Sequence, residues 1–209
     1  MGDWVNVAEV WRGDILESVH QGRAVVCDSR GDVVAAWGDV DAVTYPRSSC
    51  KMLQALPLME SGAAARFNLT PEQLALACAS HEGAHMHTDR VVKWLGDLEL
   101  GERDLRCGPQ FPRAKEEQEE LIRFGQKHDR THNNCSGKHS GFLTLNKHLG
   151  GDAEYVEPDH PVQQAILTAF EEMTGETSPG YGIDGCSAPN HACTLRGLAT
   201  AMARMADPS

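Results

Sequence analysis

The spacing of hydrophobic and polar residues changes partway along the chain. Before residue 40, apolar and polar positions alternate, and a period of two is typical of β-strands. This pattern predicts strands over residues 5–11, 17–26 and 33–37. A glycine-containing turn at residues 28–32 would join the last two strands into a hairpin. We therefore expect three antiparallel strands at the start of a sheet.

From residue 48 onward, apolar residues recur every three or four positions, which is the period of an amphipathic helix. Thr70 followed by Pro71 is typical of a helix start, with Thr70 as the N-cap. No segment after residue 190 has a strong strand pattern. The helices that this pattern predicts cover residues 48–58, 70–78, 88–98, 113–124, 138–149, 161–173 and 194–205.

This order of elements, strands first and helices afterwards, predicts an α+β fold. A chain of 209 residues is long enough to bury a sizeable core. No clear linker divides it, so we expect a single domain over residues 1–209. Its N-terminal strands would lie in residues 1–40 and its helical catalytic region in residues 41–209.

Composition and charge narrow the possible functions. Hydrophobic residues make up 41% of the chain and charged residues 23%, which is an ordinary globular composition. A net charge of −11 argues against nucleic acid or an anionic membrane as the main partner. No apolar run approaches the length of a membrane helix. The first residues lack the basic region and apolar core of a secretory signal, so we expect a cytoplasmic protein.

The cysteines also fit a cytoplasmic protein. The chain has seven cysteines, an odd number, and no secretion signal, which argues against a disulfide framework. Most of them can be small buried hydrophobic residues, and one or two can be metal ligands. The absence of a CxxC motif excludes a standard zinc finger.

Ser48 and Lys51 form the first candidate pair for chemistry. Three residues apart, they would share one face of a helix. A neutral lysine can take the proton of a serine hydroxyl, provided that burial or another cation lowers its pKa. The same Ser-x-x-Lys spacing occurs in class A β-lactamases and penicillin-binding proteins. Alone it is a weak signal, because short serine–lysine coincidences are common.

Residues 79–87 are rich in groups that transfer protons. Ser80 follows a predicted helix, and three histidines come after it, at positions 81, 85 and 87. These histidines could bind a metal, but glycine and alanine lie between them, and a polar helix end is the interpretation that we favour. Ser80 would then present its hydroxyl where the core meets a loop.

Residues 131–141 contain a cysteine, a lysine and a histidine within five positions. Lys138 could lower the pKa of Cys135 and so favour its thiolate. That thiolate could be a nucleophile with His139 as its base, or it could be a metal ligand. Asn133 and Asn134 could donate to an oxyanion. The alternative is a glycine-rich helix start with a buried cysteine.

Residues 180–189 contain three glycines around Asp184 and Cys186. In an extended chain, Asp184 and Cys186 would point to the same side. Cys186 could join Cys135 around a thiophilic metal such as Zn²⁺.

Together, residues 45–57, 79–87, 133–143 and 182–189 resemble the asparaginase II family, the serine–lysine, zinc-containing class often called rhizobial-type. The resemblance runs through essentially the whole chain, in the order of the family. Four separate motifs are far more specific than any one of them.

The resemblance implies an amidohydrolase that converts L-asparagine to L-aspartate and ammonia, with a serine β-lactamase/glutaminase-like fold, usually as a homodimer. It implies that Ser48 pairs with Lys51 and that Ser80 pairs with another lysine further along. The residues that it assigns to zinc are Cys135, Lys138 and Cys186, and those beside the substrate are Arg47, Asp184 and His139. Arg47 would grip the α-carboxylate.

Members of the family are longer than this chain. We therefore expect that the chain lacks the C-terminal third, which would hold the lysine partner of Ser80 and the strands that complete the sheet. Two alternatives stay open at this point. One is a cysteine amidohydrolase that uses Cys135 and His139, and the other is an inactive, truncated binding or partner subunit. The preference between asparagine and glutamine, and the choice between Ser48 and Ser80 as nucleophile, are also open.

Overall fold

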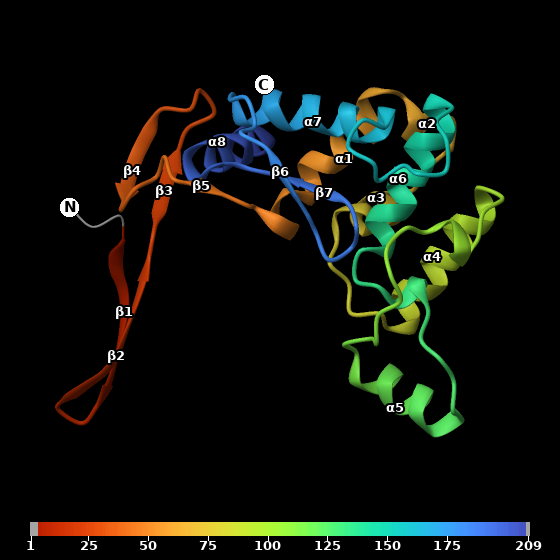
Figure 1. Cartoon of the computed structure of the whole chain (residues 1–209), viewed down its shortest axis with the longest axis horizontal. Helices are drawn as coiled ribbons and strands as arrows, with labels where there is room; N and C mark the ends of the chain where they lie inside the picture. The colour runs from red at the N-terminus through yellow and green to blue at the C-terminus, as the bar shows by residue number, and fades with distance from the viewer. Residues whose placement is uncertain (1–3, 208–209) are drawn as a thin grey trace. The chain divides into compact units, whose positions relative to one another are not determined.

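The computed structural model describes residues 4–207 and has the α+β architecture that the sequence predicts, with antiparallel strands first and a mostly helical region after them (Figure 1). The strands are β1 (Val5–Arg12), β2 (Ile15–Gly22), β3 (Ala24–Cys27), β4 (Val33–Trp37), β5 (Val43–Thr44), β6 (Tyr181–Ile183), β7 (Pro189–His191) and β8 (Cys193–Thr194). The α-helices are α1 (Lys51–Glu60), α2 (Ala63–Arg66), α3 (Pro71–Cys78), α4 (His85–Asp97), α5 (Lys115–Phe124), α6 (Ser136–Leu149), α7 (Pro161–Thr174) and α8 (Leu195–Ala206). Three 3₁₀ turns are η1 (Arg47–Cys50), η2 (Glu102–Asp104) and η3 (Arg130–His132).

The N-terminal strands pair differently from the prediction. The expected strand over residues 17–26 is two strands, since β2 pairs with β1 while β3 pairs with β4. Two separate hairpins therefore replace the expected three-stranded start of a sheet. The first hairpin turns at Gly13, whose φ of 60° is easy for a glycine. The turn at Gly13-Asp14 indicates this first hairpin, and the alternation of apolar and polar residues alone does not.

The chain divides into two compact units. The first consists of Met1–Pro46, Glu171–Gly180 and Ala192–Ser209, and the second of Arg47–Phe170 and Tyr181–His191. In the first unit, α8 packs against β3 and β5 pairs with β8. The single domain expected over residues 1–209 stays a prediction, because two compact units can belong to one domain.

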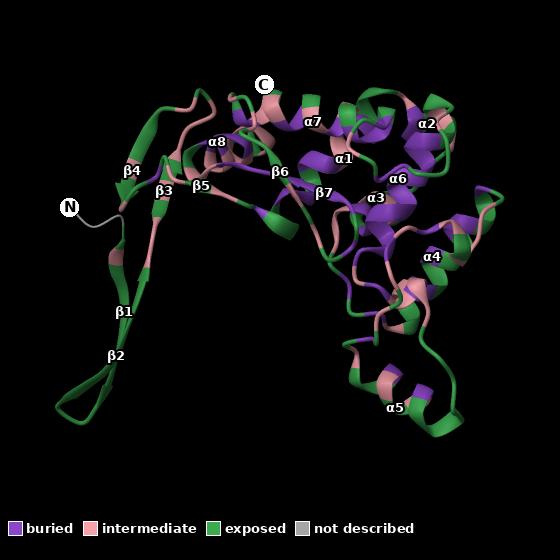
Figure 2. Ribbon diagram, in the orientation of Figure 1, coloured by how far each residue is buried: buried purple, intermediate pink, exposed green. Residues whose placement is uncertain are grey.

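In the second unit, α6 is the central helix. It contacts α1, α2, α3 and α4, and every residue from Ser136 to Asn146 is buried (Figure 2). Two glycines allow this close packing. A Cβ at Gly137 would lie 2.5 Å from the Leu76 carbonyl oxygen, and one at Gly141 would lie 3.3 Å from the Ala77 side chain. A helix that is buried on all sides in this way is a core element rather than an amphipathic surface helix.

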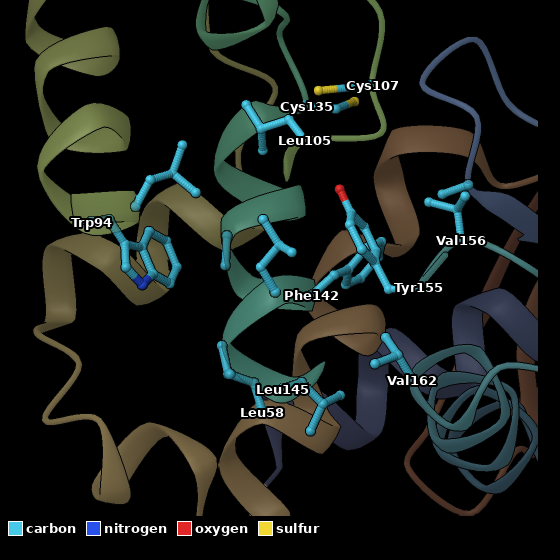
Figure 3. Packing of buried hydrophobic residues seen from close by; sticks show 14 of the residues in the cluster. Leu58, Trp94, Leu105, Cys107, Cys135, Phe142, Leu145, Tyr155, Val156 and Val162 are labelled. Carbon is cyan, nitrogen blue, oxygen red and sulfur yellow. The ribbon is translucent and has the colours of Figure 1, made fainter. Parts of the chain in front are cut away.

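Buried hydrophobic residues from these helices and the loops between them form one cluster (Figure 3). Trp94 of α4 also donates a hydrogen bond to the Thr144 hydroxyl of α6, at 3.1 Å. Figure 3 shows the Tyr155 hydroxyl pointing toward the end of the cluster where Cys107 and Cys135 lie. The core therefore continues directly into a group of buried polar and sulfur-containing residues.

The start of α3 follows the sequence prediction, whereas α1 begins three residues later than expected. Thr70 caps α3, with its hydroxyl accepting from the Gln73 backbone N–H and Pro71 at the first helical position, as predicted. α1 continues through Pro57 to Glu60. Across the described residues, none of these helices combines the length and apolar character that crossing a membrane requires.

Candidate active site

Four segments of the second unit bring the candidate residues together. They are η1 with the first residue of α1, the loop between α3 and α4, the start of α6, and the turn between β6 and β7. Hydrogen bonds and one ion pair connect all four. The candidate residues come from distant parts of the sequence and meet only through the fold.

Lys51 contacts Ser80, which lies 29 residues further along the chain. Its Nζ donates to the Ser80 hydroxyl at 2.8 Å and to the Ala79 carbonyl at 2.6 Å. The lysine is only 2% exposed, whereas Ser80 is exposed. Burial lowers the pKa of Lys51, although the nearby Cys135 sulfur opposes this effect. The pair therefore joins an accessible hydroxyl to a buried amine that deprotonates more easily than an ordinary lysine.

Ser48 lies apart from this contact. It is an exposed residue of the 3₁₀ turn η1, which precedes the α-helix that starts at Lys51. Within residues 4–207, no hydrogen bond joins the Ser48 hydroxyl to Lys51. The expected spacing on one helical face is absent because the helix begins only after Ser48. The pairing thus differs from the Ser48–Lys51 and Ser80–distant lysine arrangement that the sequence led us to expect.

His81 holds the loop that carries Ser80. Its backbone N–H donates to the Asn134 carbonyl at 3.2 Å, its Nε2 lies 2.8 Å from the Ser136 hydroxyl, and its Nδ1 accepts from the Gly83 backbone N–H at 3.1 Å. Burial lowers the pKa of His81 to about 4, so the ring is neutral near pH 7. Both ring nitrogens serve the loop, which fixes Ser80 relative to the start of α6.

The other two histidines of this stretch lie at the start of α4. His85 pairs with Glu120 at 3.1 Å, and the ring of His87 stacks on that of His81 with centroids 5.1 Å apart. These contacts place the three histidines in a polar network around the loop.

Cys135, Lys138 and Cys186 form a buried cluster. All three are less than 5% exposed, and Lys138 Nζ donates to Cys186 Sγ at 3.1 Å. A hydrogen bond from the Cys135 thiol is the main cause that lowers the pKa of Cys186, and the same bond raises the pKa of Cys135. Burial alone would lower the pKa of Lys138, but the charges of Cys186 and Cys135 outweigh it and raise the pKa overall.

The donor chemistry of this cluster fits a zinc ion. Two sulfurs and one nitrogen meet in a buried place, and zinc prefers these atoms. Asp184 is close enough to act on Lys138 through its charge and could supply an oxygen. Among the described residues there is no group of three or more His, Cys, Asp and Glu side chains that could hold a metal. The cluster differs from such a group because its third donor is a lysine, which must be neutral to bind.

Arg47 and Asp184 form an ion pair at 2.6 Å. The Arg47 side chain is 67% exposed and that of Asp184 only 12%. The Arg47 backbone N–H also donates to the Asn190 side chain at 3.4 Å. Arg47 has a φ of 54° and Ser187, in the turn after Asp184, has a φ of 71°, and both values are unusual for residues with a side chain. Such strained residues occur often at functional sites.

His139 is fully buried, and its Nδ1 lies 2.8 Å from the Tyr155 hydroxyl. Its Nε2 has no hydrogen-bond partner among the described residues, and the nearby ring lowers the pKa of Cys186. Together with the raised pKa of Cys135, this arrangement does not favour a Cys135 nucleophile activated by His139.

Sequence reasoning missed Tyr155 and Asn190. Tyr155 lies in the segment between α6 and α7, where no motif marks it. Asn190 follows directly on the glycine-rich stretch at residues 180–189, so its position near that stretch was the available signal.

The comparisons with known proteins agree with the resemblance. A family model described as L-asparaginase II matches residues 8–209. No curated protein matches the chain.

Proposed function

Because the chain belongs to the L-asparaginase II family, we propose that it is an amidohydrolase that converts L-asparagine to L-aspartate and ammonia. The observation that carries this proposal within the molecule is the 2.8 Å contact between Lys51 Nζ and the Ser80 hydroxyl. It joins an exposed nucleophile to a buried base, which is the arrangement that acyl transfer needs.

In this mechanism, Ser80 is the nucleophile and Lys51 the general base. Neutral Lys51 takes the hydroxyl proton as the Ser80 oxygen attacks the side-chain amide carbon of asparagine. The C–N bond then breaks, Lys51 returns the proton to the nitrogen, and ammonia leaves an ester on Ser80. Water, deprotonated by the same amine, hydrolyses this ester to aspartate and restores the hydroxyl.

Ser48 has a separate role in this proposal. Its exposed hydroxyl lies on the same turn as Arg47 and has no bond to Lys51 in the described chain. We assign it to substrate contact rather than to nucleophilic attack. Removing its hydroxyl would then lower activity far less than removing that of Ser80.

Arg47 and Asp184 would recognise the amino-acid end of the substrate. Free asparagine carries an α-carboxylate and an α-ammonium group, and the ion pair presents one charge for each. A guanidinium can bind a carboxylate through two parallel hydrogen bonds. The pair is therefore complementary to a zwitterion and would reject an amide without these charged groups.

Cys135, Lys138 and Cys186 would hold a zinc ion beside the substrate. When bound, it would supply a fixed positive charge that orients the substrate. Without it, the buried sulfurs and the amine still hold one another by hydrogen bonds. A homodimer and a cytoplasmic location, both expected from the sequence, remain predictions.

The test is ammonia release from L-asparagine by the purified chain, with L-glutamine as the comparison substrate. We expect turnover of asparagine by the wild-type chain and loss of turnover in Ser80→Ala. Ser18→Ala, an exposed serine of the N-terminal hairpin, is the matched control and should keep full activity. Equal turnover in Ser80→Ala and Ser18→Ala would contradict the mechanism.

A further inference from the structure

Buried hydrogen bonds lead from the backbone of Arg106 through the Tyr155 hydroxyl to Nδ1 of His139, and the other ring nitrogen of His139 is buried without a partner in the described chain. The proposed reaction uses neither ring. We propose that Tyr155 fixes the tautomer and orientation of His139 so that its Nε2–H donates to the sulfur of Cys186 and positions it as a metal ligand. This inference rests on the metal site of the proposed function and extends it to two positioning residues.

The direction of the chain is set at its far end. The Arg106 backbone N–H lies 2.8 Å from the Tyr155 hydroxyl oxygen, and a backbone N–H can only donate. The oxygen of Tyr155 therefore accepts there. The hydroxyl proton of Tyr155 is then donated to the other close polar atom, Nδ1 of His139, at 2.8 Å. Burial raises the pKa of Tyr155, so this proton stays on the phenol.

The next step follows from the chemistry of imidazole. A neutral ring has one N–H and one acceptor nitrogen. If Nδ1 accepts from Tyr155, the proton is on Nε2. This Nε2 is buried, and within residues 4–207 it has no hydrogen-bond partner of good distance and angle. Cys186 is the polar side chain near enough to act on this ring, and His139 in turn lowers the pKa of Cys186.

Packing holds the His139 ring in place. Its centroid lies 5.6 Å from that of Tyr155 and 5.5 Å from that of Phe142. The ring itself is fully buried. A ring held on two sides cannot follow a moving sulfur, so it defines where the Cys186 sulfur lies relative to Lys138, 3.1 Å away.

This arrangement has the form of an outer-shell contact to a metal ligand. Such contacts orient the ligand, and their loss costs about 10- to 100-fold in metal affinity. A histidine that only fills the core would not show this dependence on the Tyr155 hydroxyl. Tyr155→Phe removes that hydroxyl and leaves the ring, so it separates the two roles.

The first test needs no metal. In the metal-free full chain, the ¹⁵N shifts of His139 should show the Nε2–H tautomer. In Tyr155→Phe the Nδ1–H tautomer should appear or dominate, because Nδ1 loses its donor. Tyr181→Phe, which removes an exposed hydroxyl, should leave the tautomer unchanged. A wild-type His139 protonated at Nδ1 would overturn the proposal.

The second test is zinc affinity, measured by competition with a chromophoric chelator. Tyr155→Phe should bind zinc about 10- to 100-fold more weakly than the wild-type chain and Tyr181→Phe. Equal affinity in all three would overturn the positioning role. A wild-type chain that binds no zinc would contradict the proposed metal site instead, and the tautomer measurement would still decide the hydrogen-bond chain.

A second pair of variants tests the proposal independently, in case Tyr155→Phe does not fold. In His139→Gln, the amide nitrogen can occupy the place of Nε2 and donate to the sulfur, whereas His139→Leu has no donor. We expect His139→Gln to keep more of the zinc affinity than His139→Leu when both show cooperative melting. Equal loss in the two variants would show that the ring only fills space and would overturn the proposal.

Discussion

Lys51 Nζ donates a hydrogen bond of 2.8 Å to the hydroxyl of Ser80, a residue 29 positions away. It makes no such bond to Ser48, three positions away, in the described chain. The 3₁₀ turn η1 explains this pairing, because Ser48 lies in that turn and the α-helix starts only at Lys51. The side chain of Lys51 points into the core, toward the end of α3. The Ser-x-x-Lys spacing therefore brings the lysine to a different serine from the one in the motif.

The two serines should differ strongly in their contribution to turnover. Ser80→Ala removes the hydroxyl that Lys51 contacts, so we expect kcat to fall by several orders of magnitude. Ser48→Ala should retain most of the activity and change KM more than kcat. Steady-state ammonia release measures both constants. A larger loss of kcat in Ser48→Ala than in Ser80→Ala would reverse the assignment.

Turnover should be lost when Lys51 is replaced by a residue that is permanently charged. Arginine cannot lose its proton in a protein, so Lys51→Arg keeps a charge at this place but cannot act as a base. We expect turnover in Lys51→Arg to fall as far as in Lys51→Met, about 10²- to 10⁴-fold, which is typical of a lost general base. Lys93→Arg, on the surface of α4, is the matched control. Substantial turnover in Lys51→Arg would exclude this lysine as the base.

The Lys51 amine should also determine the rising limb in the pH profile of kcat/KM. Burial lowers its pKa below the ordinary 10.5. Because the base must be neutral, kcat/KM should rise with pH and level off above this lowered pKa. A pH–rate profile measured with asparagine locates the limb. A profile without any rising limb below pH 10.5 would be inconsistent with a lysine base.

Arg47 and Asp184 should act on substrate affinity. Arg47→Lys keeps the charge but loses the planar fork, so we expect KM for asparagine to rise by about 10-fold or more with a small change in kcat. Asp184→Asn should raise KM in the same way. Arg113→Lys, outside these contacts, should leave KM unchanged. Unchanged KM in both site variants would show that the ion pair does not bind the substrate.

Gly137 and Gly96 offer a matched pair for stability. Gly137→Ala would place a Cβ 2.5 Å from the Leu76 carbonyl oxygen, so α3 and α6 must separate. We expect a lower free energy of unfolding by about 1–3 kcal/mol, the usual cost of overpacking. Gly96→Ala, on the exposed side of α4 with open space around it, should instead stabilise by up to about 1 kcal/mol. Chemical denaturation measures both. Equal effects would contradict the close contact between α3 and α6.

The sequence predicted what depends on neighbouring residues. The capped start of α3 at Thr70 and Pro71 is confirmed, because the cap is made by residues three positions apart. The helix predicted over residues 138–149 is also confirmed and begins two residues earlier, at Ser136. The motifs likewise identified segments that the fold brings together, as Lys138 and Cys186 show.

What the sequence did not predict depends on contacts between distant residues. The two N-terminal hairpins differ from the expected sheet because the strand pattern cannot tell which neighbour a strand pairs with. The partner of Lys51 depends on where α3 ends in space. Tyr155 has no motif because its role is set only by His139 and the Arg106 backbone.

The most direct test of the central claim is the site of the covalent intermediate. Rapid acid quenching of the chain during turnover of asparagine, followed by peptide mapping with mass spectrometry, identifies the residue that carries the aspartyl group. We predict the aspartyl ester on the peptide that contains Ser80, and its absence in Ser80→Ala. An adduct on Ser48 or Cys135 would contradict the account.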